Sequence, residues 1–340
     1  MKKTTAVFLT IGILSGLLIA GTAAYNLLDT LVIPHAAGNA SDLTSASLNF
    51  SDQSSTSFSS SSSSPKSGSS TSVTSSSSSS LSSSALSKTS VTYTEGKYTC
   101  YSGKDITYHL VDINLRSVAD LHRHIVTDSS GNFGQGIDAT VSEQVSSVEE
   151  KDGVKVLAAI NGDTCFYSNS NAGYVIADGK TYRKTKRSGS QQDFALFANG
   201  SILSYLESEY TYSQISSMNN GCYQNWVFGP SLIENGALTV TPKSEIDGKN
   251  TAADPRTAIG FVDSKHFFFL TTDIDGKRGT GSGFLLYDLA NLLLGEGCTF
   301  AYNLDGGGSA TMYVESEGGV VNDNTYGYER TLSDMVYVVE

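Results

Sequence analysis

Two aspartates lie at the ends of apolar runs that have the length and composition of buried strands. Asp163 follows the run KVLAAI through Asn161 and Gly162, and Asp305 follows the run TFAYNL. A side chain at the end of a buried strand is held firmly yet can face a cleft, where a carboxylate can act as nucleophile or general base. We therefore take Asp163 and Asp305 as candidate catalytic residues, with either role open to either residue. A plain turn is the alternative interpretation of Asn161-Gly162-Asp163.

Three consecutive glycines follow Asp305. Gly306, Gly307 and Gly308 lack β-carbons, so their backbone N–H groups can approach a ligand closely. Successive N–H groups of this kind can form an anion-binding nest, here flanked by the Asp305 carboxylate and the Ser309 hydroxyl. A tight turn is the alternative, but a simple turn has little use for three glycines. The segment predicts a site for an anionic group.

Arginine supplies the planar fork that pairs best with phosphate or carboxylate. Arg256 follows Pro255, which fixes the entry to the strand RTAIGFV, so its side chain projects from a defined place. Arg330, just before the last predicted strand, and Asp275, in the turn DIDGKR, are further candidates for binding a ligand. The alternative for each is a surface ion pair or a solvated turn. The basic run between Arg183 and Arg187 is interpreted as a solvated loop.

Several other mechanisms have no support in the sequence. The nucleophile elbow GxSxG, the zinc motif HExxH and the P-loop are all missing, and His122 with His124 lacks a third metal ligand. We predict no metal site and no cofactor. An Asp-rich site outside the cell could hold Ca²⁺, but the sequence contains no full ligand set for it. Of the four cysteines, we expect Cys165 and Cys222 to pair and Cys298 to be a free core thiol.

Strands dominate the elements that must position these residues. Turn signals at 178–179, 199–200, 235–236 and 263–265 each separate two apolar runs and predict four hairpins. Helices are expected over 138–150, with a capping box from Thr140 to Glu143, and over 282–294. Many hairpins with few helices predict an α+β domain with a mixed, hairpin-rich β-sheet. Further strands are expected at 105–115, 155–160, 226–233, 299–304, 311–315 and 335–339.

The first 92 residues differ in composition from the rest of the chain. Residues 1–30 hold two lysines followed by a long uncharged run, which predicts a cytoplasmic tip and a signal-anchor transmembrane helix. A cleaved signal peptide, cut near Gly21–Ala24, is the alternative. Residues 31–92 form a serine-rich linker, expected to be disordered, and residues 93–340 form the domain. Both alternatives place that domain outside the cell, on a single-pass membrane anchor or secreted.

The net charge of the domain limits the kinds of molecule that it is expected to bind. Residues 1–90 hold four lysines and three acidic residues, so the remainder carries −13 against a total of −12. A strongly acidic domain is a poor binder of nucleic acid, so we expect none as a partner. An anionic substrate then needs a local positive site. The sequence does not specify an oligomeric state.

Five motifs occur in an order that resembles a known family: AINGD, FGPSLIENG, DPRTAIGF, AYNLDGGGSATMY and YERTLSDMVYV. Together they resemble the phosphodiester glycosidases, whose bacterial members are often described as exopolysaccharide biosynthesis proteins. The resemblance covers about residues 100–340. It implies cleavage of a sugar 1-phosphodiester at the anomeric C–O bond, which releases a sugar and a phosphomonoester. The residues it carries over are Asn161, Asp163, Arg256, Asp305, Ser309 and Arg330.

Three hypotheses of function are compatible with these residues. The first is a hydrolase that acts on a carbohydrate phosphodiester of the cell envelope or an exported polysaccharide. The second is a non-catalytic polysaccharide-binding or assembly module, supported by 18 tyrosines that suit sugar stacking. The third is a phosphodiesterase that cleaves the P–O bond. All three predict one cleft shared by Asp163, Arg256 and Asp305.

Overall fold

The computed structural model describes residues 88–134, 136–164, 173–243, 252–276 and 283–340. Within these ranges no helix has both the length and the apolar character needed to cross a membrane. The predicted anchor, nearly all of the predicted linker, and Cys165 lie outside the described residues. The first strand begins at Ser90, inside the stretch that sequence analysis assigned to the linker.

The largest sheet has seven strands, all paired antiparallel, in the order β1-β2-β13-β12-β14-β10-β11. In its centre Thr257 of β12 pairs with Leu304 of β14. The residues just before β12 therefore meet the residues just after β14, which include Asp305. Its strands are β1 (Ser90–Thr99), β2 (Asp105–Asn114), β10 (Ser231–Glu234), β11 (Ala237–Leu238), β12 (Thr257–Phe261), β13 (His266–Thr272) and β14 (Phe300–Leu304).

Two five-stranded antiparallel sheets complete the domain, in the orders β16-β15-β4-β17-β3 and β6-β5-β9-β7-β8. The first consists of β3 (Leu121–Ile125), β4 (Val156–Asn161), β15 (Met312–Val314), β16 (Gly319–Val320) and β17 (Asp334–Val339). The second consists of β5 (Val175–Ala177), β6 (Lys180–Arg183), β7 (Gln192–Phe197), β8 (Ile202–Leu206) and β9 (Cys222–Trp226).

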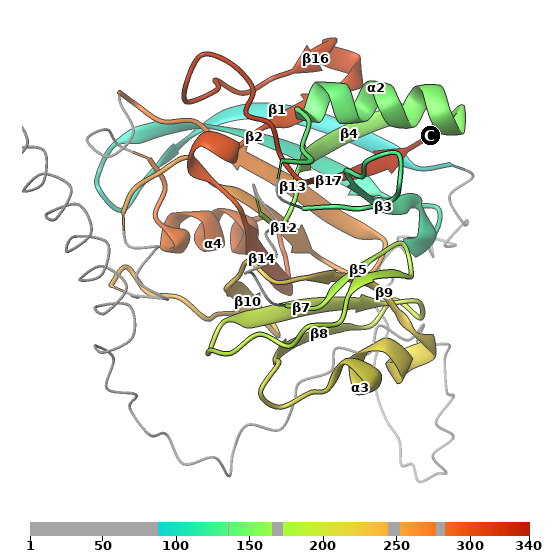
Figure 1. The fold of residues 1–340 in the computed structure, drawn as a ribbon. Coiled ribbons are helices and arrows are strands. Elements are labelled where there is room, and N and C mark those ends of the chain that lie inside the picture. Colours follow the sequence, from blue (N-terminus) through green and yellow to red (C-terminus); the bar gives the residue numbers. More distant parts are fainter. Residues whose placement is uncertain (1–87, 135, 165–172, 244–251, 277–282) are drawn as a thin grey trace, which may run out of the picture. The chain divides into compact units, whose positions relative to one another are not determined.

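All three sheets contribute to one apolar core. Val111, Phe261, Val336, Phe194 and Trp226 belong to it, and each is fully buried. Burial of this size is the main stabilising term of the domain. In the part of the chain that the structure describes, three α-helices cover outer faces: α2 (Val141–Asp152) packs on β4, α3 (Tyr212–Ser217) on β9, and α4 (Leu286–Gly295) on β10 and β14 (Figure 1).

The structure confirms the α+β class, the four hairpins and the Thr140–Glu143 capping box of α2. Three predictions need correction. The expected mixed sheet is wrong, because every strand pair in the three described sheets is antiparallel. The expected strand 226–233 is interrupted by the cis Gly229-Pro230 bond, which separates β9 from β10. The expected helix 282–294 starts at Leu286, because the Asp288 carboxylate accepts the Leu285 N–H and so caps the helix there. Strands β1 and β3 and the short helix α3 were not predicted.

Candidate active site

The candidate site lies where the ends of β4, β12 and β14 meet, and Asn161 joins them. Its amide Nδ2 donates to the Asp305 carbonyl at 2.6 Å. Its Oδ1 accepts from the Thr257 hydroxyl at 2.7 Å and from the Thr311 N–H at 3.2 Å. The side chain is 1% exposed. Asn161, predicted to bind substrate, instead fixes the backbone that carries Asp305.

Asp305 leads a polar cluster at the outer side of this junction. Its Oδ2 accepts from the Ser309 hydroxyl at 2.8 Å, and its Oδ1 accepts from the Gly306 N–H at 2.9 Å. Arg330 Nη1 in turn donates to the Ser309 hydroxyl at 3.4 Å. Asp305 and Arg330 are both partly exposed, whereas Ser309 is buried. The prediction that Asp305, Ser309 and Arg330 belong to one site is therefore compatible with their contacts.

The glycine run serves close packing rather than the predicted anion nest. The Gly306 N–H is bound to Asp305, and the Gly307 N–H donates to the Pro255 carbonyl at 2.8 Å, so two of the three amides are committed within the protein. A β-carbon at Gly306 would lie 2.6 Å from the Pro255 carbonyl oxygen, and one at Gly308 would lie 2.3 Å from the Tyr326 ring. Gly307 has φ +61°, a conformation that favours glycine.

Arg256 lies next to this loop, but its guanidinium is engaged with the protein backbone. Nε donates to the Phe284 carbonyl at 3.1 Å and Nη2 to the Ala252 carbonyl at 2.5 Å, and the residue is 5% exposed. The structure thus places Arg256 beside the site as a support of neighbouring segments. Asp275 forms an exposed ion pair with Lys104 at 3.6 Å, in agreement with the surface alternative.

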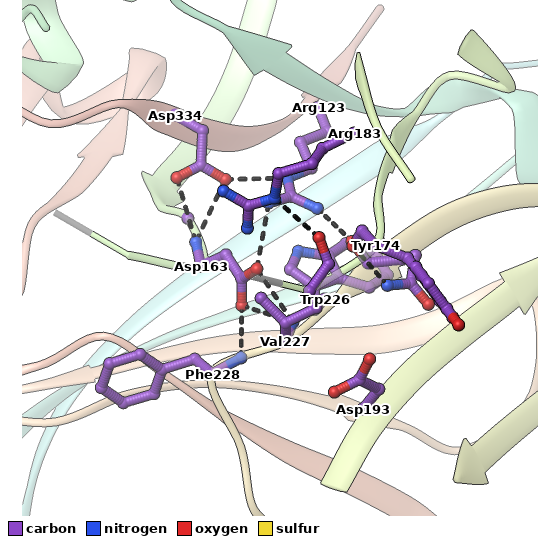
Figure 2. Close-up of polar contacts among 12 residues, drawn as sticks. Arg123, Asp163, Tyr174, Arg183, Asp193, Trp226, Val227, Phe228 and Asp334 are labelled. Carbon is purple, nitrogen blue, oxygen red and sulfur yellow. Dashed lines mark hydrogen bonds and ion pairs between the residues drawn. The ribbon is translucent and has the colours of Figure 1, made fainter. Parts of the chain in front are cut away.

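Asp163 occupies a different environment, a buried polar network (Figure 2). Its carboxylate accepts from the Val227 N–H at 2.8 Å, the Phe228 N–H at 2.7 Å and Arg123 Nη2 at 3.3 Å. Its own N–H donates to the Asp334 carboxylate at 3.1 Å. Asp163 is 0% exposed. The contacts of this carboxylate are those of a group that joins two sheets, because Val227 and Phe228 follow β9.

Arg123 and Asp334 complete the buried network. Arg123 Nε donates to Asp334 at 2.7 Å, and its Nη1 donates to the Asn225 carbonyl; both charged side chains are fully buried. Burial raises the pKa of Asp334 to about 6; the Arg123 charge opposes this rise and the Asp163 charge adds to it. Gly162 allows the close approach, since a β-carbon there would lie 2.2 Å from Asp334 Oδ2.

Sequence reasoning missed Arg123 and Asp334. The available signal was the alternation of Leu121, Arg123 and Ile125 in a short segment, which places the arginine on the buried face of a strand. Of the two neighbouring histidines, His122 forms a hydrogen bond with the Asp178 carboxylate at 3.1 Å and His124 forms one with the Gln144 amide oxygen at 3.2 Å.

The basic run from Arg183, the last residue of β6, to Arg187 is only partly solvated. Arg183 Nε donates to the Gly173 carbonyl at 2.7 Å, and Arg187 pairs with the buried Asp193 and donates to the Val227 carbonyl. Lys184 is exposed. The prediction of a solvated loop is therefore wrong for the two arginines.

The predicted Cys165–Cys222 disulfide is also wrong. Cys222 is a free, buried thiol whose Sγ donates to the Gln224 carbonyl at 3.3 Å. Cys298 is a free core thiol, as predicted. Over the residues that the structure describes, no three His, Cys, Asp or Glu side chains are grouped to hold a metal ion.

Comparison with known proteins identifies the family. The family model for phosphodiester glycosidases matches residues 154–339, a range that includes every predicted site residue, and the chain belongs to this family. The chain is 25% identical over 245 residues to the SPbeta prophage-derived uncharacterized protein YomE of Bacillus subtilis. That alignment covers 68% of this chain and 36% of YomE, so the chain spans about a third of the length of that relative.

A solved structure has the same fold. It is the catalytic domain of zebrafish N-acetylglucosamine-1-phosphodiester alpha-N-acetylglucosaminidase, auto-inhibited by its pro-peptide. The TM-score is 0.57 with 19% identity, and the match covers 74% of this chain and 83% of that one. At this identity the similarity concerns the fold.

Proposed function

We propose that the chain hydrolyses sugar 1-phosphodiesters at the anomeric C–O bond and that Asp305 is the catalytic carboxylate. The observation that carries the proposal is the contrast between the two candidate aspartates. Asp305 is partly exposed and lies beside an arginine and a hydroxyl, whereas Asp163 is fully buried among protein donors. A carboxylate must reach the anomeric carbon, or the water that attacks it, to act on the substrate.

Each residue of the outer cluster has a part in this reaction. The Asp305 carboxylate attacks the anomeric carbon or activates a water, and it stabilises the oxocarbenium-like transition state by its charge. Arg330 offers a positive charge to the departing phosphate, where negative charge develops. The Ser309 hydroxyl lies between them and fixes the orientation of the carboxylate. A phosphomonoester leaves readily, so the reaction depends less on a strong general acid than ordinary glycoside hydrolysis does.

Isotope labelling tests the bond that is broken. The purified full-length chain would be incubated with a sugar 1-phosphodiester in oxygen-18 water, and both products would be analysed by mass spectrometry. We expect the label in the sugar. Label in the phosphate would instead show P–O cleavage, and binding of several sugars without turnover would favour a carbohydrate-binding module. The anomer that is released first distinguishes attack by Asp305 from attack by water.

We also propose that residues 1–30 anchor the chain in the cell membrane and that residues 31–87, the part of the expected linker that precedes the described residues, act as a flexible linker. From Ser41 to Ser90, 28 of 50 residues are serine, a composition that cannot form a packed core. A random coil of this length extends on the order of 40 Å, which would place the domain among polymers just outside the membrane. Protease treatment of intact cells that carry a C-terminal tag tests this, because loss of the tag is expected only if the domain is outside.

A further inference from the structure

An exposed pair of aromatic rings borders the candidate site. Tyr326 is 48% exposed and Tyr328 is 65% exposed. Their ring centroids lie 5.9 Å apart with an angle of 27° between the planes, so the two rings are stacked. Within the described ranges, Tyr101 is the remaining large hydrophobic side chain with comparable exposure. Exposed aromatic groups that gather in one place commonly mark a binding surface.

The pair is continuous with the Asp305 loop. The Tyr326 ring packs so closely on Gly308 that a β-carbon there would lie 2.3 Å from Cε2 of the ring. Gly308 follows Asp305 by three residues. On the other side of the pair, Arg330 follows Tyr328 by two residues and donates to Ser309. A ligand that lies on the two rings is therefore next to the group that carries out the proposed reaction.

The backbone under the rings is held in place. The Thr325 hydroxyl donates to the Gly307 carbonyl at 3.0 Å, which ties the segment to the glycine run. The Asp323 N–H donates to the Asp273 carboxylate at 3.0 Å, and Asp273 is itself paired with the buried His109 at 3.2 Å. A surface that is fixed before binding loses little conformational entropy when a ligand arrives.

We propose that Tyr326 and Tyr328 form a sugar-stacking platform that binds a pyranose unit adjacent to the one that is cleaved. That the bound unit is the neighbour of the cleaved one rests on the proposed function. It implies that the natural substrate is an oligosaccharide or polysaccharide phosphodiester rather than a small sugar diester. Tyrosine combines an apolar ring, which can cover the C–H face of a pyranose, with a hydroxyl that can bind sugar hydroxyls.

The size of the platform favours a sugar over a protein partner. Two tyrosine rings about half exposed present roughly 200 Å² of surface. A stable protein interface needs about 800 Å² on each partner. The platform is large enough for one sugar ring and far too small for a protein interface.

Binding of neutral oligosaccharides to the full-length chain tests the platform. The probes are hexasaccharides of α-glucan, β-glucan, chitin, mannan and galactan, titrated by calorimetry against the wild type, Tyr328→Ala and Tyr328→Trp. We expect at least one probe to bind, Tyr328→Ala to weaken its binding about tenfold, and Tyr328→Trp to retain it. The matched control is Tyr101→Ala, which removes a side chain that is 63% exposed and packs edge-on against Tyr287. We expect that variant to bind within twofold of the wild type.

Three results would overturn the platform: no probe binds, Tyr328→Ala binds as well as the wild type, or Tyr101→Ala loses as much. Thermal unfolding of each variant shows whether a loss of binding comes from misfolding.

A kinetic comparison separates this proposal from the proposed function. The ratio of kcat/KM for an oligosaccharide phosphodiester to that for a single-sugar 1-phosphodiester should fall about tenfold in Tyr328→Ala and stay unchanged in Tyr101→Ala. If the wild type hydrolyses neither substrate but binding depends on Tyr328, the proposed reaction fails and the platform stands. If hydrolysis occurs and neither binding nor the ratio depends on Tyr328, the platform fails and the reaction stands.

Discussion

Replacement of Asp305 by asparagine should abolish turnover and leave the fold almost unchanged. The side chain accepts one hydrogen bond from the Ser309 hydroxyl and one from the Gly306 N–H. Asparagine keeps one oxygen acceptor, and the Ser309 hydroxyl can rotate to accept from the new amide. The hydrogen bond from the Ser309 hydroxyl to a charged carboxylate is therefore exchanged for a neutral one, at a cost of about 1 kcal/mol. In a domain of this size that cost lowers the thermal midpoint by about 2–4 °C.

The effect on activity should be far larger. Asparagine has no negative charge, so it can neither attack the anomeric carbon nor activate water. Loss of a general base or nucleophile of this kind lowers kcat by about 10²–10⁴-fold. The assay is the initial rate of phosphomonoester release from a sugar 1-phosphodiester, measured beside a thermal unfolding curve of the same preparation.

Asp163→Asn is the matched comparison. Its amide oxygen can still accept from the Val227 and Phe228 N–H groups at the Oδ1 position, but its NH₂ group would then face the Arg123 Nη2 donor at the Oδ2 position. The negative charge that faces the buried Arg123 would also be lost. The expected cost is about 3 kcal/mol, or roughly 6–12 °C in the thermal midpoint. The reasoning is refuted if Asp305→Asn retains activity, or if Asp163→Asn is as stable as the wild type while turnover disappears. Either result would exchange the roles that we give to the two aspartates.

Three further predictions concern the buried residues. Gly162→Ala should lower the free energy of unfolding, measured by chemical denaturation, by about 3 kcal/mol, because the new β-carbon would lie 2.2 Å from a carboxylate oxygen of buried Asp334. The control is Gly295→Ala, whose β-carbon would meet nothing within 4 Å, and we expect it to be neutral or slightly stabilising. The pKa of Asp334 is raised to about 6 in the folded protein, so the folded state binds this proton more tightly than the unfolded state does. The free energy of unfolding of the wild type, relative to that of Asp334→Asn, should therefore rise by roughly 1 kcal/mol as the pH falls from 7.5 to 5. A decrease over this pH range would contradict the raised pKa of Asp334. Burial raises the pKa of Cys222 to about 12, so iodoacetamide should modify this thiol only after denaturation, and peptide mapping of native and denatured samples checks this.

The sequence was sufficient for the hairpins and for the motif that leads the candidate site. Hairpins depend on local turn residues, such as Asp178-Gly179 and Asn235-Gly236, whose left-handed conformations are fixed within the turn itself. The cluster of Asp305 and Ser309 is equally local, because the two residues are four apart in one loop. Local chemistry of this kind can be interpreted without the rest of the chain.

Contacts between segments that are distant in the sequence could not be predicted from local residue patterns. Asp163 differs from Asp305 because its carboxylate binds the Val227 and Phe228 N–H groups. These two residues lie more than 60 positions from Asp163 in the sequence and follow a strand of another sheet. Arg256 looked like a phosphate ligand because the carbonyl groups that bind its guanidinium cannot be inferred from its own neighbours in sequence. The sequence suggested that the three glycines supply backbone amides to an anion, whereas the close approach of Pro255 and Tyr326 explains better why Gly306 and Gly308 lack side chains.

The buried network around Asp163 has a consequence for the order in which the domain is assembled. Arg123 and Asp334 belong to one five-stranded sheet, and Asn225, Val227 and Phe228 belong to or directly follow a strand of the other. Neither sheet alone can satisfy these charged groups, so neither gains its full stability before the other has docked. We expect the amide protons of Val227 and Phe228 to exchange with solvent only through global unfolding, while those of the hairpin at 178–179 exchange through local opening. A polar contact far from solvent would thus make two sheets fold as a single cooperative unit.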